Sequence, residues 1–412
     1  MNFFSTHILE ILIGNKILFE KLDFLFGSNA LTIKSFLLKV YSRKDYSKIS
    51  NIKEFIPSLL RYGLISDKED SKEKGASSLM FANILNFELT YKCQYSCPHC
   101  LQIKYRHIEV TELSTRQIKE IIFQGHIAGL CRRGINFTGG EVLGNRDDFF
   151  EILEYVQLLN IPYRINTNSS WARTKNLNIC NTLFSHPTDL VRFLKSKGLY
   201  MFAFSFDERY LSGKYDDGDL IESIRICEQE KVHYQIIFTG IKPEQIKFHV
   251  SELAKVCSIN FNYLIPVTME MVDIGMASDL NKEKYNWQTN KCSCNNKGFF
   301  RPTIIHVSPS GKVRTCIYAN GLSNFGDIQK SSFVELINNF PFTRNNKVFS
   351  DSVEYSEHYK KLLKPYLNIY QPIIHDCTKN IILAKTIERY YRTDNNLVDI
   401  HFQIGKEMNK LK

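Results

Sequence analysis

The sequence predicts an α/β protein whose largest part is a parallel sheet, in the form of a partial (βα)6 TIM barrel. Six strand-like segments alternate with helix-like segments between residue 84 and about residue 266, which is the pattern of βα units with parallel strands. Six units are too few for a complete eight-stranded barrel. At 412 residues the chain exceeds the size at which one hydrophobic core stops growing, so smaller domains are expected beside the barrel.

The first 66 residues predict a small α+β domain of winged-helix type. Gly14 and Asn15 separate two apolar segments, which predicts a hairpin over residues 8–22. Two amphipathic helical patterns follow, and the second ends at Gly63. The polar stretch DKEDSKEKGASS then predicts a linker over residues 67–80.

Residues 81–275 are predicted to form the barrel. The strand candidates are 84–91, 135–139, 163–168, 201–207, 233–240 and 259–265. The helix candidates lie near 114–130, 147–159, 186–197, 218–230 and 243–257. Because active sites in such folds gather at the carboxyl ends of the strands, functional residues are expected directly after each strand.

Composition and charge exclude several classes of protein. A hydrophobic content of 43% and a charged content of 23% are typical of a globular chain. No apolar run is long enough to span a bilayer, and residues 1–12 lack the features of a signal peptide, so a cytoplasmic protein is expected. The net charge of +10 is spread along the chain without a basic arm, which argues against nucleic-acid binding. An odd count of eleven cysteines in a reducing compartment favours metal ligation or catalysis over disulfides.

A cysteine triplet follows the first predicted strand directly. CQYSCPHC places Cys93, Cys97 and Cys100 at CxxxCxxC spacing, a pattern that chance would produce about 0.008 times in this composition. Three thiolates on one loop suit a [4Fe–4S] cluster with one iron left open. A zinc site that includes His99 and three structural thiols are the alternatives.

This loop resembles the signature of the radical S-adenosylmethionine (SAM) superfamily, which carries CxxxCxxC after the first strand of a partial (βα)6 barrel. The resemblance implies that the open iron binds SAM and that reductive cleavage yields a 5′-deoxyadenosyl radical. His99 stands at a position that is usually aromatic in the family.

Polar motifs after the next strands resemble the SAM-binding elements of the same family. Gly139, Gly140 and Glu141 end the second strand and are similar to its GGE motif, although Val142 stands where the family often has Pro. The resemblance implies contacts to SAM from these residues. Family members also contact SAM from the ends of later strands, where this chain has Asn166, Asn168, Ser205 and Asp207. Polar capping of turns is the alternative for these four residues.

Residues 276–412 resemble the twitch and SPASM domains that bind auxiliary clusters. Pro309-Ser310-Gly311 predicts a hairpin, and a GxxxxC segment ends at Cys316. Together with Cys292, Cys294 and Cys377, this residue would supply four thiolates for one auxiliary [4Fe–4S] cluster. Buried free thiols or a zinc site are the alternatives. Cys131, Cys227 and Cys257 fall at apolar helical positions and are expected to be structural, and Cys180 lies in a segment that reads as irregular.

The first 66 residues are similar in pattern to PqqD-like recognition elements of enzymes that mature ribosomal peptides (RiPPs). Such elements bind a leader peptide by strand addition; a generic winged-helix or docking module is the alternative. The resemblance implies a peptide maturase that forms a thioether or a C–C or C–O cross-link, with a precursor peptide and a flavodoxin- or ferredoxin-type electron donor as partners. A sulfatase-maturase-like protein modification, a small-metabolite substrate, or a non-catalytic Fe–S docking protein are the other hypotheses.

Overall fold

The computed structural model describes the barrel region and part of the segment that follows it. The described ranges are 84–97, 99–102, 111–131, 133–207, 217–259, 266–269, 295–296, 299–300, 304–318 and 322–340, with a few single residues near them. The predicted N-terminal domain and linker, and most of the C-terminal part including Cys292, Cys294 and Cys377, lie outside the described residues.

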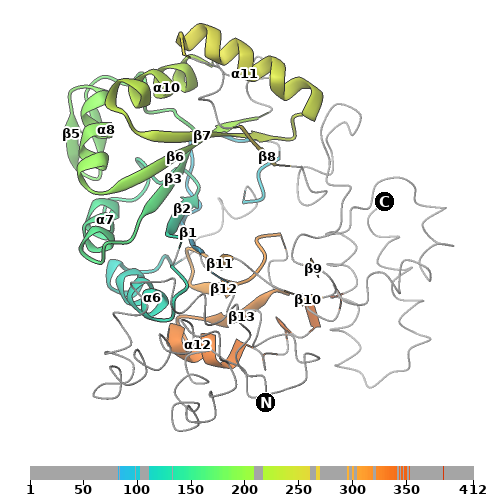
Figure 1. The fold of residues 1–412 in the computed structure, drawn as a ribbon. Coiled ribbons are helices and arrows are strands. Elements are labelled where there is room, and N and C mark those ends of the chain that lie inside the picture. The colour runs from blue at the N-terminus through green and yellow to red at the C-terminus, as the bar shows by residue number, and fades with distance from the viewer. Residues whose placement is uncertain are drawn as a thin grey trace, which may run out of the picture.

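A nine-stranded sheet forms the centre of the described structure (Figure 1). Its order is β13-β12-β11-β1-β2-β3-β6-β7-β8, and the strands from β11 to β8 run parallel. The strands of the barrel are β1 (Ile84–Thr90), β2 (Ile135–Gly139), β3 (Tyr163–Thr167), β6 (Leu199–Phe206), β7 (His233–Thr239) and β8 (Pro266–Met269).

Helices connect consecutive parallel strands, as the sequence predicts. They are α6 (Thr115–Ile127), α7 (Phe149–Leu158), α8 (Pro187–Ser196), α10 (Gly218–Glu230) and α11 (Pro243–Cys257). Figure 1 shows these five helices along one face of the curved sheet, with the opposite face directed away from them. The predicted α/β fold with a parallel sheet is therefore confirmed.

The structure describes a sixth barrel strand at Pro266–Met269, directly after the predicted range 259–265; residue 259 is outside any strand and residues 260–265 lie outside the described residues. One predicted element differs from the structure. The segment that read as irregular contains a hairpin of β4 (Leu177–Ile179) and β5 (Thr182–Phe184). Cys180 and Asn181 form its turn with φ of 51° and 59°. This is the backbone of a type I′ turn, which usually carries glycine, so the sequence lacked the usual signal.

Strands from the C-terminal part extend the same sheet at its β1 edge. β11 (Ile304–Val307) pairs parallel with β1, and the hairpin predicted at Pro309-Ser310-Gly311 joins it to antiparallel β12 (Lys312–Arg314). β13 (Asn324–Asp327) and α12 (Phe333–Asn339) follow. A separate two-stranded sheet is made of β9 (Asn295–Asn296) and β10 (Phe299–Phe300).

The two faces of the sheet differ in polarity. On the outer face, Leu85 lies against Gly125 of α6, and Phe137 contacts Phe149 of α7 edge-on with ring centroids 5.3 Å apart. Because side chains alternate along a strand, Asn86, Glu88 and Thr90 of β1 point to the inner face, opposite to Leu85. These three side chains are polar and buried, and both carboxylate oxygens of Glu88 accept from Nη2 of Arg314 on β12, at 2.6 and 2.5 Å.

His306 of β11 also belongs to the inner face, where it pairs in register with Arg314. Burial and the neighbouring Arg314 charge lower the pKa of His306 from 6.5 to about 3. Between these two pH values the unfolded chain takes up a proton at this position and the folded chain does not, so acid destabilises the fold.

His306→Gln is expected to weaken the pH dependence of stability between pH 6.5 and pH 3. The free energy of unfolding of the wild type should fall by up to about 1.4 kcal/mol per pH unit from this residue alone. Urea denaturation of the apoprotein at a series of pH values measures the slope. His233→Gln, at an exposed position on β7, is the matched control. An unchanged slope in His306→Gln would contradict the stated cause.

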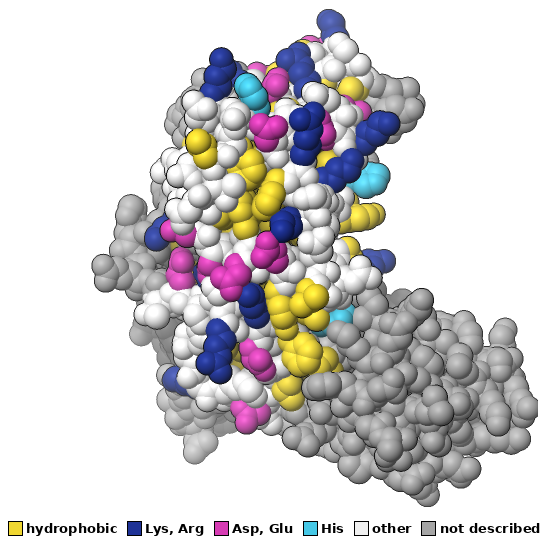
Figure 2. Space-filling view, turned by 90° about the vertical axis from the view of Figure 1, so that its left-hand side faces the viewer, with side chains coloured by type: hydrophobic (Ala, Val, Ile, Leu, Met, Phe, Trp, Pro, Cys, Tyr) yellow, Lys and Arg dark blue, Asp and Glu magenta, His cyan; other side chains and the backbone are white. Residues whose placement is uncertain are grey.

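The outer surface carries mixed charges. Figure 2 shows basic and acidic side chains interspersed over this face, with hydrophobic side chains between them. This agrees with the even distribution of charge along the sequence. Among the described residues, no helix has the length and hydropathy required to cross a membrane.

Candidate active site

The ends of four neighbouring strands bring most of the predicted site residues together. β1, β2, β3 and β6 are parallel neighbours, so their carboxyl ends lie at one edge of the sheet. The cysteine loop follows β1, the Gly-Gly-Glu motif ends β2, Asn168 follows β3 and Asp207 follows β6. The site is therefore a convergence of loops that are distant in the sequence.

The three cysteines of the loop are all partly exposed, unlike the buried Cys131, Cys227 and Cys257 in the core. Cys100 N donates to Cys97 O at 3.0 Å, which turns the chain between these two residues. In the described part of the chain no three His, Cys, Asp or Glu side chains are grouped around the position of a single ion. Each thiolate of a [4Fe–4S] cubane binds a different iron, so convergence on one point is not what such a cluster requires.

Gly139 and Gly140 press directly against the backbone that begins the cysteine loop. Gly140 N donates to Thr90 O at 2.6 Å, and the next amide, Glu141 N, donates to Lys92 O at 2.9 Å. A Cβ on Gly140 would lie 1.8 Å from Lys92 O, and one on Gly139, whose φ is +125°, would lie 2.4 Å from Thr90 O. Only glycine permits this approach, so the double glycine positions the cysteine loop.

Glu141 is a buried carboxylate that joins the end of β2 to the end of β3. Its oxygens accept from Thr167 Oγ1 at 2.9 and 3.0 Å and from Asn168 N at 2.8 Å. Leu143 N donates to the same side chain at 3.3 Å. These contacts hold the acidic group at the strand edge beside the cysteine loop.

Asn168 contacts the cysteine loop from β3. Its Nδ2 lies 3.6 Å from Cys93 Sγ, and its Oδ1 accepts from Gln94 Nε2 at 3.2 Å and from Ser170 N at 3.0 Å. Asn168 is therefore a polar neighbour of the first cysteine. Asn166, by contrast, lies on β3 below this edge, and its buried Oδ1 has no hydrogen-bond partner.

Asp207 approaches the same loop from β6. Its Oδ2 lies 3.6 Å from His99 Nε2, and its side chain is buried. His99 directly precedes Cys100, so the pair ties the end of β6 to the last cysteine. Ser205 is half-buried two residues earlier on β6, and among the described residues no hydrogen bond joins its side chain to the loop.

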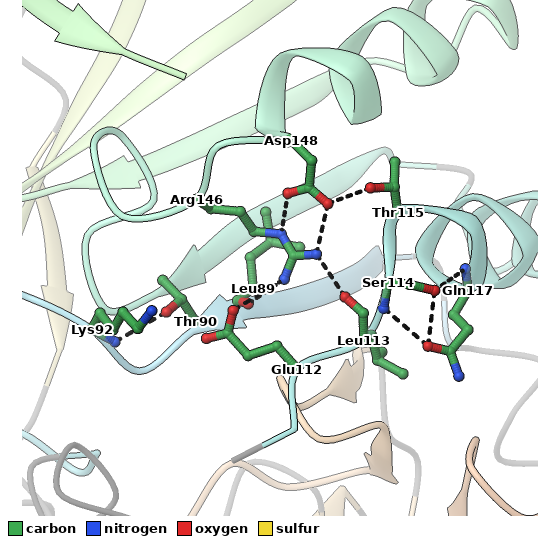
Figure 3. A network of polar contacts seen from close by, with 10 residues as sticks. All are labelled: Leu89, Thr90, Lys92, Glu112, Leu113, Ser114, Thr115, Gln117, Arg146 and Asp148. Atoms are coloured by element: carbon green, nitrogen blue, oxygen red, sulfur yellow. Dashed lines mark hydrogen bonds and ion pairs between the residues drawn. The ribbon is translucent and has the colours of Figure 1, made fainter. Parts of the chain in front are cut away.

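Arg146 is a functional candidate that the sequence did not reveal (Figure 3). Its buried guanidinium donates to Leu89 O at 2.9 Å and to Leu113 O at 2.7 Å. Asp148 accepts from the same group at 2.7 and 3.0 Å, and Glu112 lies 3.6 Å away. Leu89 and Leu113 stand on either side of the cysteine loop, so one side chain holds both ends of that loop.

The network continues into the start of α6. Thr115 Oγ1 donates to Asp148, and Ser114 caps the helix in a capping box with Gln117. No local sequence pattern marks Arg146, because the role of a buried arginine in a loop is recognised only from the groups that it contacts in the folded protein. Its function is positional.

Arg146→Gln is expected to destabilise the apoprotein by about 3 kcal/mol, since it breaks a buried ion pair and leaves two buried carbonyls without their donor. The loop ends should also separate, lowering the iron content after reconstitution. Urea denaturation and iron analysis measure both effects. Arg192→Gln removes an exposed ion pair with Glu230 and should cost less than about 1 kcal/mol. Equal effects of the two substitutions would contradict a clamping role.

The other cysteines occupy different surroundings. Cys316 follows β12 and is buried, and Ser323 Oγ donates to its carbonyl at 3.0 Å. Burial raises the pKa of Cys180 to about 11, and its thiol donates to Arg146 O at 3.2 Å. Burial likewise raises the pKa values of Cys227 and Cys257, as expected for structural thiols.

Sequence comparison matches residues 87–244 to the Radical SAM superfamily. Mycofactocin maturase MftC of Mycobacterium tuberculosis is 36% identical over 84 residues, and MftC of Mycolicibacterium smegmatis is 34% identical over 84 residues. Each match covers 20% of this chain and 20% of the relative, so the chain spans only a fifth of the length of these relatives.

Two solved structures that align with part of this chain are native anSMEcpe with bound AdoMet and BtrN in complex with AdoMet and 2-DOIA. The first is 13% identical with a TM-score of 0.44, and covers 76% of this chain and 99% of that chain. The second is 14% identical with a TM-score of 0.37, and covers 65% of this chain and 86% of that chain. The matched range begins within β1 and ends within α11, and so contains the cysteine loop, the Gly-Gly-Glu motif, Asn168 and Asp207. Residues 87–244 of this chain therefore match the model of the Radical SAM superfamily, and the candidate site lies inside the matched range.

Proposed function

We propose that the protein is a radical SAM enzyme that modifies a ribosomal peptide. The observation that carries this proposal is the contact between the cysteine loop and the Gly-Gly-Glu motif at one strand edge. A cysteine triplet alone is compatible with zinc, whereas the close approach of Gly140 to Lys92 O places an acidic residue and a polar strand end beside the three thiols.

The residues of the site fit the cofactors of this chemistry. Three partly exposed thiols on a loop can ligate a [4Fe–4S] cluster, whereas the thiols whose pKa is raised by burial lie elsewhere. The proposed cluster ligands are Cys93, Cys97 and Cys100. The residues proposed to bind SAM are Gly139, Gly140, Glu141, Asn168, Ser205 and Asp207.

When bound, the cluster and SAM supply a carbon-centred radical that removes a hydrogen atom from the substrate, using one electron from a flavodoxin- or ferredoxin-type donor. The protein's part is positional. Glu141 offers carboxylate oxygens to a cationic amino group, Asn168 lies against Cys93, and Arg146 holds the two ends of the loop.

A peptide is the proposed substrate class. The local similarity to a protein named mycofactocin maturase supports it, as does the pattern resemblance of residues 1–66 to leader-binding elements. In this proposal residues 1–66 bind the leader, residues 67–80 are a linker, and residues 81–275 carry out the chemistry in the cytoplasm. The bond formed is a thioether or a C–C or C–O cross-link.

An auxiliary [4Fe–4S] cluster is proposed for residues 276–412, in a twitch- or SPASM-like arrangement. The proposed ligands are Cys292, Cys294, Cys316 and Cys377. Of these, Cys316 is described. It follows β12, which pairs antiparallel with β11, so Cys316 lies toward the amino ends of β11 and β1. A cluster there would be able to accept an electron from a substrate held on the inner face.

Anaerobic reconstitution tests the proposal. The reduced protein should show two [4Fe–4S] signals by electron paramagnetic resonance and should convert SAM to 5′-deoxyadenosine, measured by chromatography. Short peptides encoded beside the gene should then change mass in the presence of enzyme, SAM and reductant. Protein that binds zinc tightly, contains no iron and leaves SAM intact would refute the proposal.

A further inference from the structure

A row of polar side chains crosses the inner face of the sheet below the cysteine loop. The strand register places Arg164, Asn136 and Asn86 side by side on β3, β2 and β1. Arg164 Nε donates to Asn136 Oδ1 at 2.8 Å, and Asn136 Nδ2 donates to Asn86 Oδ1. We call these three residues the Arg164 row. Within the described part of the chain, no hydrogen bond or ion pair joins these residues to the cysteine loop or to the residues proposed to bind SAM.

The direction of the hydrogen bonds in the Arg164 row follows from chemistry. A guanidinium can only donate, so Asn136 must turn its oxygen toward Arg164 and its amide nitrogen toward Asn86. Asn86 must then present its own oxygen to Asn136. This leaves Asn86 Nδ2 as a donor, and that buried atom has no hydrogen-bond partner. The row therefore has unused donors at both ends.

The charge of the row is also uncompensated. In the described part of the chain Arg164 has one polar contact, the neutral Asn136, and no carboxylate forms an ion pair with it. The acidic residue on the same face, Glu88, already accepts from Nη2 of Arg314 with both carboxylate oxygens. Arg164 is partly buried, and burial lowers its pKa. A partly buried cation without a counterion is a favourable partner for an anionic group of a ligand.

The position of the row suits a substrate rather than the cofactor. Arg164 and Asn166 share one face of β3 because side chains alternate along a strand, and Asn168 follows directly after the strand. Asn168 contacts Cys93. Arg164 is four residues earlier, roughly 13 Å along the strand at about 3.3 Å per residue. A ligand bound to Arg164 would extend upward along the inner face toward the cysteine loop.

We propose that the Arg164 row binds a carboxylate group of the substrate, so that the substrate is anchored below the reacting atoms. Arg164 supplies the positive charge and Asn86 Nδ2 a further donor. This inference rests on the proposed function in taking the substrate to be a peptide. A peptide offers such a group either at its C-terminus or on an Asp or Glu side chain.

Binding of small probes tests this without turnover. Three probes are used. N-acetyl-L-alanine carries an α-carboxylate, and the α-amide of N-acetyl-L-aspartic acid carries only the side-chain carboxylate. N-acetyl-L-alaninamide is neutral. Saturation-transfer NMR with the reconstituted full-length protein should detect at least one carboxylate probe and not the amide. The preferred carboxylate probe identifies the source of the group.

Three variants locate the binding site. Arg164→Gln should weaken binding of the carboxylate probe by at least about tenfold, the loss expected for one charged hydrogen-bonded contact. Arg164→Lys keeps the charge and should retain part of the binding. Asn86→Asp has the same shape but replaces the donor by a negative group, so it should also lose the probe. Arg116→Gln, at an exposed position on α6, is the control and should bind like the wild type.

Several results would overturn the proposal. They are equal binding of the neutral amide, unchanged probe binding in Arg164→Gln, and a loss of SAM affinity in Arg164→Gln while the probe still binds. SAM cleavage in the absence of substrate should persist in Arg164→Gln. Failure of the wild type to cleave SAM would refute the proposed function, whereas probe binding is measured independently of cleavage.

Discussion

Replacement of Cys93 by alanine is expected to abolish SAM cleavage. The proposed cluster depends on three thiolates, and removal of one leaves an iron without its protein ligand. The loss should exceed the roughly 10–100-fold effect typical of residues that only support a metal ligand. Iron content, the electron paramagnetic resonance signal of the reduced protein and the rate of 5′-deoxyadenosine formation measure it. Cys97→Ala and Cys100→Ala should behave in the same way.

The control for these substitutions removes a cysteine outside the loop. Cys180 stands in the β4–β5 turn with φ of 51°, a conformation that asparagine tolerates well. Cys180→Asn should therefore retain its fold, its iron and SAM cleavage. Normal SAM cleavage by any of the three loop variants would refute their role as ligands.

Gly140→Ala is expected to cause the second large loss. The new Cβ would lie 1.8 Å from Lys92 O, which is impossible without movement of the backbone. The loop must then shift, and the bonds from Gly140 N to Thr90 O and from Glu141 N to Lys92 O would break. Both the cysteine loop and Glu141 depend on this contact. We expect iron content to fall and the SAM concentration required for half-maximal cleavage to rise by more than about tenfold, the equivalent of two lost hydrogen bonds.

Gly198→Ala separates this effect from the general cost of losing a glycine. Gly198 has φ of +89°, and the nearest atom to an added Cβ is 3.9 Å away. Alanine there costs about 1 kcal/mol of backbone strain without a clash, at a helix end away from the site. Its stability should fall while its iron content and SAM dependence stay normal. If Gly140→Ala behaved like Gly198→Ala, the proposed positioning role would be wrong.

Much of the barrel could be predicted from the sequence because its strands and helices have strong local signals. Helices α10 and α11 begin and end at the predicted residues, and β2 matches its predicted range. These elements have regular apolar periodicity, which depends only on neighbouring residues. The β4–β5 hairpin was missed because Cys180 and Asn181 occupy a turn that is usually marked by glycine.

Part of the candidate site could also be predicted from the sequence. The cysteine loop, the Gly-Gly-Glu motif, Asn168 and Asp207 could be placed at one edge because parallel strands end together. Their individual contacts could not be predicted. The pairing of His99 with Asp207 and the clamp formed by Arg146 each join residues more than 50 positions apart, and no local pattern encodes such partners.

The sequence by itself determined the kind of chemistry, because ligand type and spacing are local properties of a loop. The sequence alone shows three cysteines within eight residues and a double glycine before an acidic residue. Only the tertiary structure decided how that loop is held and what lies beneath it. Arg146 and Gly140 act through backbone carbonyls on other elements, and the Arg164 row exists only because three strands are in register. Such contacts depend on the packing of the whole sheet, so they follow from the fold and not from any segment of the chain.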